Sequence, residues 1–106
     1  MVENKKSVRT LGDYIPLAKS GAPADIDAIM SDINMEMSIA SSKIIDYSLS
    51  FVESEPGLDR MAYYLFHGTQ IQRNYCTLFF NRRGDWPLVK AAFEAGLIDE
   101  IQAFSR

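Results

Sequence analysis

"PADIDAIMSDINMEMSIASSKIIDYSLSFVE", from Pro23 to Glu53, carries the strongest structural signal in the chain. Its apolar residues recur at steps of three and four, the spacing that places side chains on one face of an α-helix. The stripe consists of Ile26, Ile29, Met30, Ile33, Met37, Ala40, Ile44 and Phe51. Pro23 suits the first turn of a helix, where a backbone N–H has no intrahelical partner to lose. The pattern therefore predicts one long helix and an all-α protein.

Other apolar residues of the same stretch lie away from this stripe. They are Met35, Ile39, Ile45, Leu49 and Val52. A helix with a single covered face needs fewer apolar positions than this. The excess predicts that the helix from Pro23 to Glu53 is central in a bundle or contributes to a dimer interface.

A second long helix is expected from about Leu58 to Arg83. Pro56 and Gly57 are adjacent turn residues that should end the first helix. Gly84 is placed to adopt the left-handed conformation that often follows a helix. A short connection makes the two long helices pack antiparallel. The resulting architecture is a small antiparallel bundle of two long helices plus a short C-terminal helical pair.

The C-terminal pair begins after Gly84. Asp85 is a good N-cap, Pro87 falls in the first turn, and Gly96 marks the end of the first short helix. In the second short helix and just before it, the expected buried residues are Ile98, Ile101 and Phe104.

Residues 1–22 are predicted to form an N-terminal arm and an ordered lead-in. Pro16 disfavours helix at the residue before it, so any helix there should be at most a short turn. Tyr14, Ile15 and Leu17 should pack onto the body. The remaining residues, 23–106, form one helical domain.

Composition places the chain among soluble cytoplasmic proteins. Its 106 residues suit one domain, and the net charge of -3 predicts solubility rather than a particular partner. Cys76 is the only cysteine, which indicates a reducing compartment. No secretory signal and no apolar run of membrane-spanning length is present in the sequence.

The sequence offers no catalytic constellation. His67 is the only histidine, so one chain cannot assemble a two-histidine metal site. Cys76 lies nine residues from His67, which places them about 13 Å apart along a continuous helix, too far for a Cys/His pair. No glycine-rich phosphate loop is present. We therefore expect no enzyme activity, no metal and no cofactor.

Polar residues interrupt the second helical pattern in "HGTQIQRNYCTLFF", residues 67–80. The expected partner-binding residues are Gly68, Gln72, Arg73, Asn74 and Tyr75. In this interpretation Gly68 admits another backbone, and the polar side chains meet groups across the contact. The alternative is that Arg73 and Asn74 satisfy buried carbonyls of the same chain.

Charge is divided unevenly along the chain. Residues 23–59 hold eight acidic residues and one lysine, whereas Arg60 to Lys90 holds five basic residues and one aspartate. Complementary packing of the two segments is one explanation. The other is a basic, aromatic surface that contacts nucleic acid, with Arg73, Arg82, Arg83 and Trp86 as its residues.

The sequence therefore predicts a non-catalytic protein-interaction or regulatory module. We expect a homodimer formed through the apolar surface of the segment from Pro23 to Glu53. The alternative is an accessory nucleic-acid-binding protein that uses the segment from Arg60 to Lys90.

Overall fold

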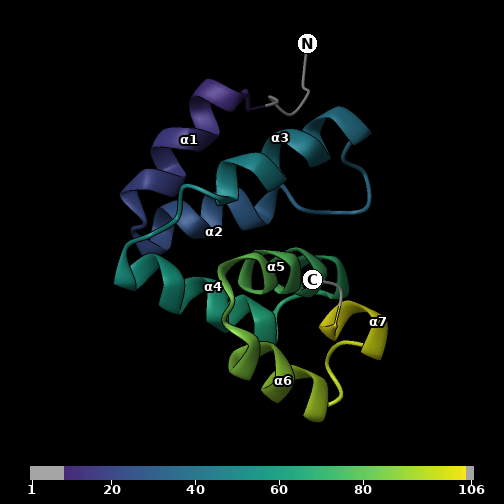
Figure 1. The fold of residues 1–106 in the computed structure, drawn as a ribbon. Coiled ribbons are helices and arrows are strands. Elements are labelled where there is room, and N and C mark those ends of the chain that lie inside the picture. Colours follow the sequence, from purple (N-terminus) through teal and green to yellow (C-terminus); the bar gives the residue numbers. More distant parts are fainter. Residues whose placement is uncertain (1–8, 105–106) are drawn as a thin grey trace.

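The computed structural model describes residues 9–104, which form seven α-helices and no strand. Figure 1 shows them in chain order. Their bounds are α1 Leu11–Ser20, α2 Pro23–Ser31, α3 Ile39–Leu49, α4 Glu55–His67, α5 Gln70–Arg83, α6 Trp86–Glu94 and α7 Glu100–Ala103. The all-α prediction is confirmed, but the arrangement as two long helices plus a short pair is not. Residues 1–8 of the predicted N-terminal arm lie outside the described range.

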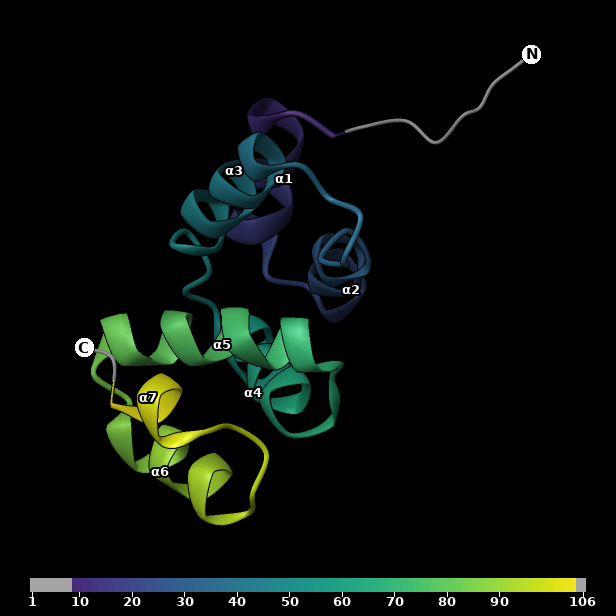
Figure 2. The same ribbon diagram turned by 90° about the vertical axis from the view of Figure 1, so that its right-hand side faces the viewer.

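The helices stack in three layers, as Figure 1 and Figure 2 show. Helices α1, α2 and α3 form one end, α4 and α5 the middle, and α6 and α7 the other end. The core runs through all three layers because each contributes fully buried side chains. Examples are Ile29 in α2, Leu65 in α4 and Val89 in α6.

The prediction of one continuous helix from Pro23 to Glu53 is wrong, because a loop at residues 32–38 divides the segment into α2 and α3. Polar side chains in the loop bond to its backbone in place of helical hydrogen bonds. The Asn34 side-chain oxygen accepts from the Glu36 N–H at 2.9 Å. The Ser38 hydroxyl accepts from the Ser41 N–H at 3.0 Å and begins α3 as its N-cap.

The loop also changes which residues of the segment are buried. In α2 the stripe residues Ile26, Ile29 and Met30 are buried, as predicted. In α3 the buried apolar residues are instead Ile45 and Leu49, which the continuous pattern placed away from the stripe. A new helix start resets the rotation of side chains about the axis, so the original stripe does not continue into α3.

The second predicted long helix is also divided, at Gly68 and Thr69. Thr69 and Gln72 form a capping box in which each side chain accepts from the other residue's N–H. Ser54 caps α4, so Pro56 lies in the first turn of α4 rather than beyond the end of a helix. Gly84 follows α5 in the left-handed region at φ 80°, as predicted.

The prediction of at most a short turn around Pro16 is wrong, because α1 is a full helix there. It runs for ten residues with Pro16 inside it, and Thr10 and Asp13 form a capping box at its start. Tyr14 is buried and Leu17 packs against the core, as expected. The buried face therefore sustains a helix that loses one internal hydrogen bond at Pro16.

The two short C-terminal helices are confirmed as α6 and α7. Ile98 is buried as predicted, but Ile101 is 82% exposed and Phe104 is 50% exposed. Because α7 has a single turn, it directs only Ala103 fully into the core. Among the described residues, no helix is long and apolar enough to cross a membrane.

Candidate interaction surfaces

Two of the predicted partner-binding residues are used inside the chain. The Gln72 side-chain amide donates to the Met30 carbonyl at 2.9 Å, which links α5 to the end of α2. Its oxygen accepts from the Thr69 N–H at 2.9 Å. A Cβ on Gly68 would lie 2.7 Å from the Tyr64 carbonyl oxygen and 3.0 Å from the Gln72 Cβ. The space beside Gly68 is therefore filled by its own chain.

Asn74 and Tyr75 also have partners in the same chain. The Asn74 side-chain oxygen accepts from the amide of Gln70 at 3.0 Å and from the amide of Gln102. The Tyr75 hydroxyl forms a hydrogen bond with the Ser42 hydroxyl. These contacts join α5 to α7 and to α3. Asn74 thus has partners within the chain, but they are side-chain amides rather than the buried carbonyls of the alternative interpretation, and its role in partner binding stays a prediction.

Arg73 differs from its neighbours. Its Nε is buried and has no hydrogen-bond partner among residues 9–104. The other four arginines of this range each pair with an aspartate. No acceptor for the Arg73 Nε lies within residues 9–104, so the alternative that Arg73 satisfies buried carbonyls has no contact in this range to support it.

Two ion pairs join the acidic segment to the basic segment, as complementary packing predicts. Arg60 of α4 pairs with Asp27 of α2 at 2.7 Å, and the Tyr64 hydroxyl donates to the same carboxylate at 2.7 Å. The Arg60 hydrogen bond holds the pKa of the Asp27 carboxyl below its usual range. Arg82 of α5 pairs with Asp46 of α3 at 2.9 Å. These pairs connect the acidic segment to the basic segment.

The other predicted nucleic-acid-binding residues lie at the end of α5 and the start of α6. Arg83 pairs with Asp85 at 3.5 Å, and the Trp86 indole N–H donates to the Asn81 carbonyl at 3.3 Å. Arg82 and Arg83 line one cavity, which Arg73 and Trp86 do not line. Arg82, Arg83 and Trp86 therefore lie close together at the junction of α5 and α6, and only Arg82 and Arg83 share a cavity.

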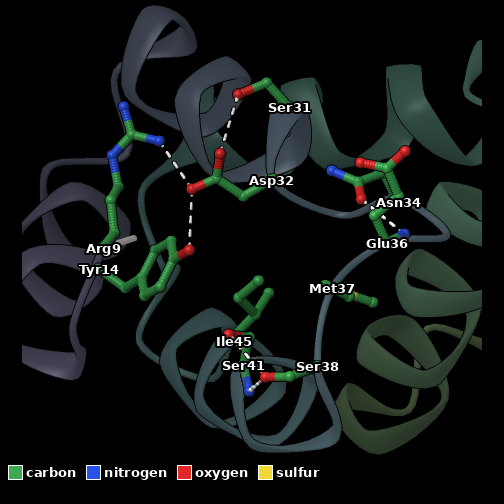
Figure 3. Close-up of a pocket in the computed structure, with 10 residues that line it drawn as sticks. All are labelled: Arg9, Tyr14, Ser31, Asp32, Asn34, Glu36, Met37, Ser38, Ser41 and Ile45. Atoms are coloured by element: carbon green, nitrogen blue, oxygen red, sulfur yellow. Dashed lines mark hydrogen bonds and ion pairs between the residues drawn. The ribbon is translucent and has the colours of Figure 1, made fainter. Parts of the chain in front are cut away.

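A larger cavity of about 330 Å³ lies under the loop between α2 and α3. Figure 3 shows Arg9 and Tyr14 both reaching one oxygen of Asp32, at 2.7 and 2.8 Å. Burial raises the pKa of the Tyr14 phenol, and the hydrogen bond to Asp32 raises it further. Met37 and Ile45 lie across the cavity from this group. The Asp32 network ties α1 to the end of α2 and anchors the loop.

The loop and α3 carry a partly apolar, solvent-exposed surface, which we call the α3 surface. It consists of Met35, Glu36, Ile39, Lys43 and Tyr47, and the exposed fractions of the three apolar members are 86% for Met35, 79% for Ile39 and 55% for Tyr47. The sequence placed Met35 and Ile39 among the apolar residues away from the stripe, but it grouped them with Ile45, Leu49 and Val52, which are buried. Ser31, Asp32 and Asn34, polar residues on either side of Ile33, were the available signal for the loop.

The chain's one cysteine and one histidine are each packed among other side chains. Cys76 is buried, and burial raises the pKa of its thiol. His67 contacts the ring of Tyr63 with centroids 4.9 Å apart. Within the described range, no group of three or more His, Cys, Asp or Glu could hold a metal ion.

Comparison of the chain with protein-family models, curated proteins and solved structures finds no match. Function is therefore inferred from the residues themselves.

Proposed function

We propose that the protein is a non-catalytic interaction module that self-associates through the α3 surface. The observation that carries the proposal is the exposure of Met35 and Ile39, at 86% and 79%. Contiguous exposed apolar side chains of this kind mark protein contacts more often than isolated ones do.

The apolar residues of this surface share one side of α3. Ile39, Lys43 and Tyr47 follow at intervals of four, so they lie on the same helical face. Met35 and Glu36 lie in the loop directly before α3. The opposite face of α3 holds Ile45 and Leu49, which are buried in the core. Helix α3 is thus anchored on one side and presents apolar groups on the other.

Charge on the α3 surface favours a second copy as the partner. Glu36 and Lys43 are exposed, and neither side chain has an ion pair or hydrogen bond within residues 9–104. A two-fold axis beside Ile39 would run the two α3 helices antiparallel. Ile39 lies about midway between Glu36 and Lys43 in the sequence. Glu36 of each copy would therefore face Lys43 of the other.

Molar mass measured by light scattering over a wide concentration range tests this proposal. The wild-type chain of 12.0 kDa should approach twice that mass. Ile39→Glu should remain monomeric, since it places two carboxylates at the axis. The substitution should leave the fold stable, because an acidic residue suits the first turn of a helix.

Ile101→Glu is the matched control. Ile101 is 82% exposed, close to the value for Ile39, but lies on α7 at the other end of the molecule. Its variant should associate like the wild type. A wild-type protein that stays monomeric at every concentration, or equal effects of both variants, would exclude the α3 surface as a self-association site.

Nucleic-acid binding through the segment from Arg60 to Lys90 is the second candidate. Arg73 supports it, because its Nε has no hydrogen-bond partner among the described residues. Binding of a single-stranded oligonucleotide, followed by fluorescence anisotropy, should then weaken steeply with salt. Arg73→Ala should reduce the salt slope by about one. An undetectable anisotropy change at low salt would exclude this candidate.

A further inference from the structure

A cavity of about 200 Å³ lies between α3 and α5. Its lining residues are Asp46, Leu49, Ser50, Phe79, Arg82 and Arg83. Leu49 is 1% exposed and Phe79 is 5% exposed, so these two side chains form an apolar floor that belongs to the core. The two arginines and Asp46 supply the charged groups of the cavity.

The Arg83 guanidinium has unused hydrogen-bonding capacity. Its contacts with Asp85 and with the Val52 carbonyl are both 3.5 Å long. The ion pairs of Arg9 and Arg60 measure 2.7 Å. A distance of 3.5 Å is beyond the usual range for an N–H···O hydrogen bond, and a guanidinium carries five N–H donors. Arg83 can therefore donate shorter and stronger hydrogen bonds to an added anionic ligand.

Arg83 is also positioned over the apolar floor. Its guanidinium carbon lies 5.5 Å from the centroid of the Phe79 ring. Arg82 lines the same cavity and holds Asp46 at 2.9 Å through one nitrogen. Two guanidinium groups thus share one small space with a single carboxylate.

The hydrogen-bond donors of the cavity decide the class of ligand. Its lining holds two arginines and one carboxylate, Asp46. Asp85 lies outside the lining and meets Arg83 only at 3.5 Å, so most N–H donors of Arg83 remain open. A cation is disfavoured there, and one carboxylate is too few for a metal ion. The planar fork of a guanidinium matches a carboxylate or a phosphate group in a bidentate contact. The floor of Leu49 and Phe79 favours an apolar body on the same molecule.

We propose that this cavity binds a small organic anion, a carboxylate or phosphate monoester carried on a short apolar body. Arg83 and Arg82 would hold the anionic group, and Phe79 and Leu49 would contact the body. This site goes beyond the proposed self-association, because its residues are not those of the α3 surface.

The test uses the full chain, labelled with nitrogen-15, and phenyl phosphate as the probe. Titration should give saturable shifts of the backbone amides of Ser50, Arg82 and Arg83. Benzyl alcohol, which has the ring without the anion, should give none. Arg83→Gln should weaken binding by about tenfold or more, as expected for loss of a charge-assisted contact.

Lys90→Gln is the matched control, because it removes one exposed positive charge of α6 outside the cavity. Its affinity should stay within about twofold of the wild type, since distant surface charges are screened. Arg82→Gln is a second variant that should also weaken binding, in case Arg83→Gln does not fold.

Four results would overturn the proposal. The first is the absence of saturation below about 10 mM phenyl phosphate, because a minimal ligand should bind with millimolar affinity. The second is equal chemical-shift changes with benzyl alcohol, and the third is unchanged affinity in folded Arg83→Gln and Arg82→Gln. The fourth is a loss of affinity in Lys90→Gln equal to that in the arginine variants. Shifts caused by an oligonucleotide but not by phenyl phosphate would assign the arginines to a nucleic-acid backbone and would also reject this ligand class. The molar mass of the wild-type protein does not depend on any of these outcomes.

Discussion

Replacing Gly21 by alanine should destabilise the protein more than a backbone effect alone can explain. Gly21 joins α1 to α2 and is buried, with φ at 64°. A Cβ there would overlap the Ser54 hydroxyl and lie 2.9 Å from the Ser54 Cβ. Ser54 is the N-cap of α4, so the contact joins the first layer of helices to the second.

The cost has two parts. Left-handed backbone costs a residue with a Cβ about 1–2 kcal/mol relative to glycine. Overpacking against Ser54 adds about 1–3 kcal/mol, unless Ser54 rotates away and gives up its cap at a similar cost. We therefore expect Gly21→Ala to lower the free energy of unfolding by about 2–5 kcal/mol.

Gly84→Ala isolates the backbone part. Gly84 has φ at 80°, and a Cβ added there would have no neighbouring heavy atom within 4 Å. The substitution should cost only about 1–2 kcal/mol. Urea unfolding followed by far-ultraviolet circular dichroism compares the two variants. Ser54→Gly should remove much of the excess cost of Gly21→Ala. If Gly21→Ala and Gly84→Ala lowered the free energy of unfolding equally, within about 0.5 kcal/mol, the packing of Gly21 against Ser54 would be refuted.

Three further predictions concern other contacts. Gln72→Ala should lower the free energy of unfolding by about 0.5–1.5 kcal/mol in urea titrations, because it removes one hydrogen bond to a Met30 carbonyl that still accepts from the Ile33 N–H, whereas Arg73→Ala should change it little. Asp27→Asn should be less stable than the wild type at neutral pH, as measured by thermal melts. Because the pKa of Asp27 is lowered in the folded state, this difference in stability should vanish as pH falls through that pKa. Cys76 should react with a thiol reagent far more slowly in the native protein than in urea, because its thiol is buried and its pKa is raised.

Helical content was readable from the sequence because apolar spacing reports local geometry. The divisions of the two long helices were encoded too, in short-range polar groups. Thr69 and Gln72 have the spacing of a capping box, and Asn34 and Ser38 are common turn and cap residues. The continuous apolar stripe outweighed these signals, because Ile33 and Met37 keep helical spacing across the loop.

The polar section around Gln72 shows what a sequence cannot supply. The Gln72 side chain donates a hydrogen bond to the Met30 carbonyl, 42 residues away in the sequence. The Asn74 amide likewise meets Gln102 of α7. Residue types indicated that these groups needed partners, but only the packing of α2, α5 and α7 identifies them. The same holds for Arg73, because the lack of a hydrogen-bond partner for its Nε among the described residues emerges only once every neighbour is placed.

If the α3 surface is complementary to its own copy, exchanging its two charged residues should first weaken and then restore the dimer. Sedimentation equilibrium at low salt should compare the wild type with Glu36→Lys, Lys43→Glu and the double variant. Each single substitution turns two attractive contacts of the dimer into repulsive ones and should raise the dimer Kd by about tenfold. The double variant restores both contacts and should recover the wild-type Kd. Equal dissociation constants for all four proteins, or a double variant weaker than either single variant, would contradict the proposed pairing of Glu36 with Lys43.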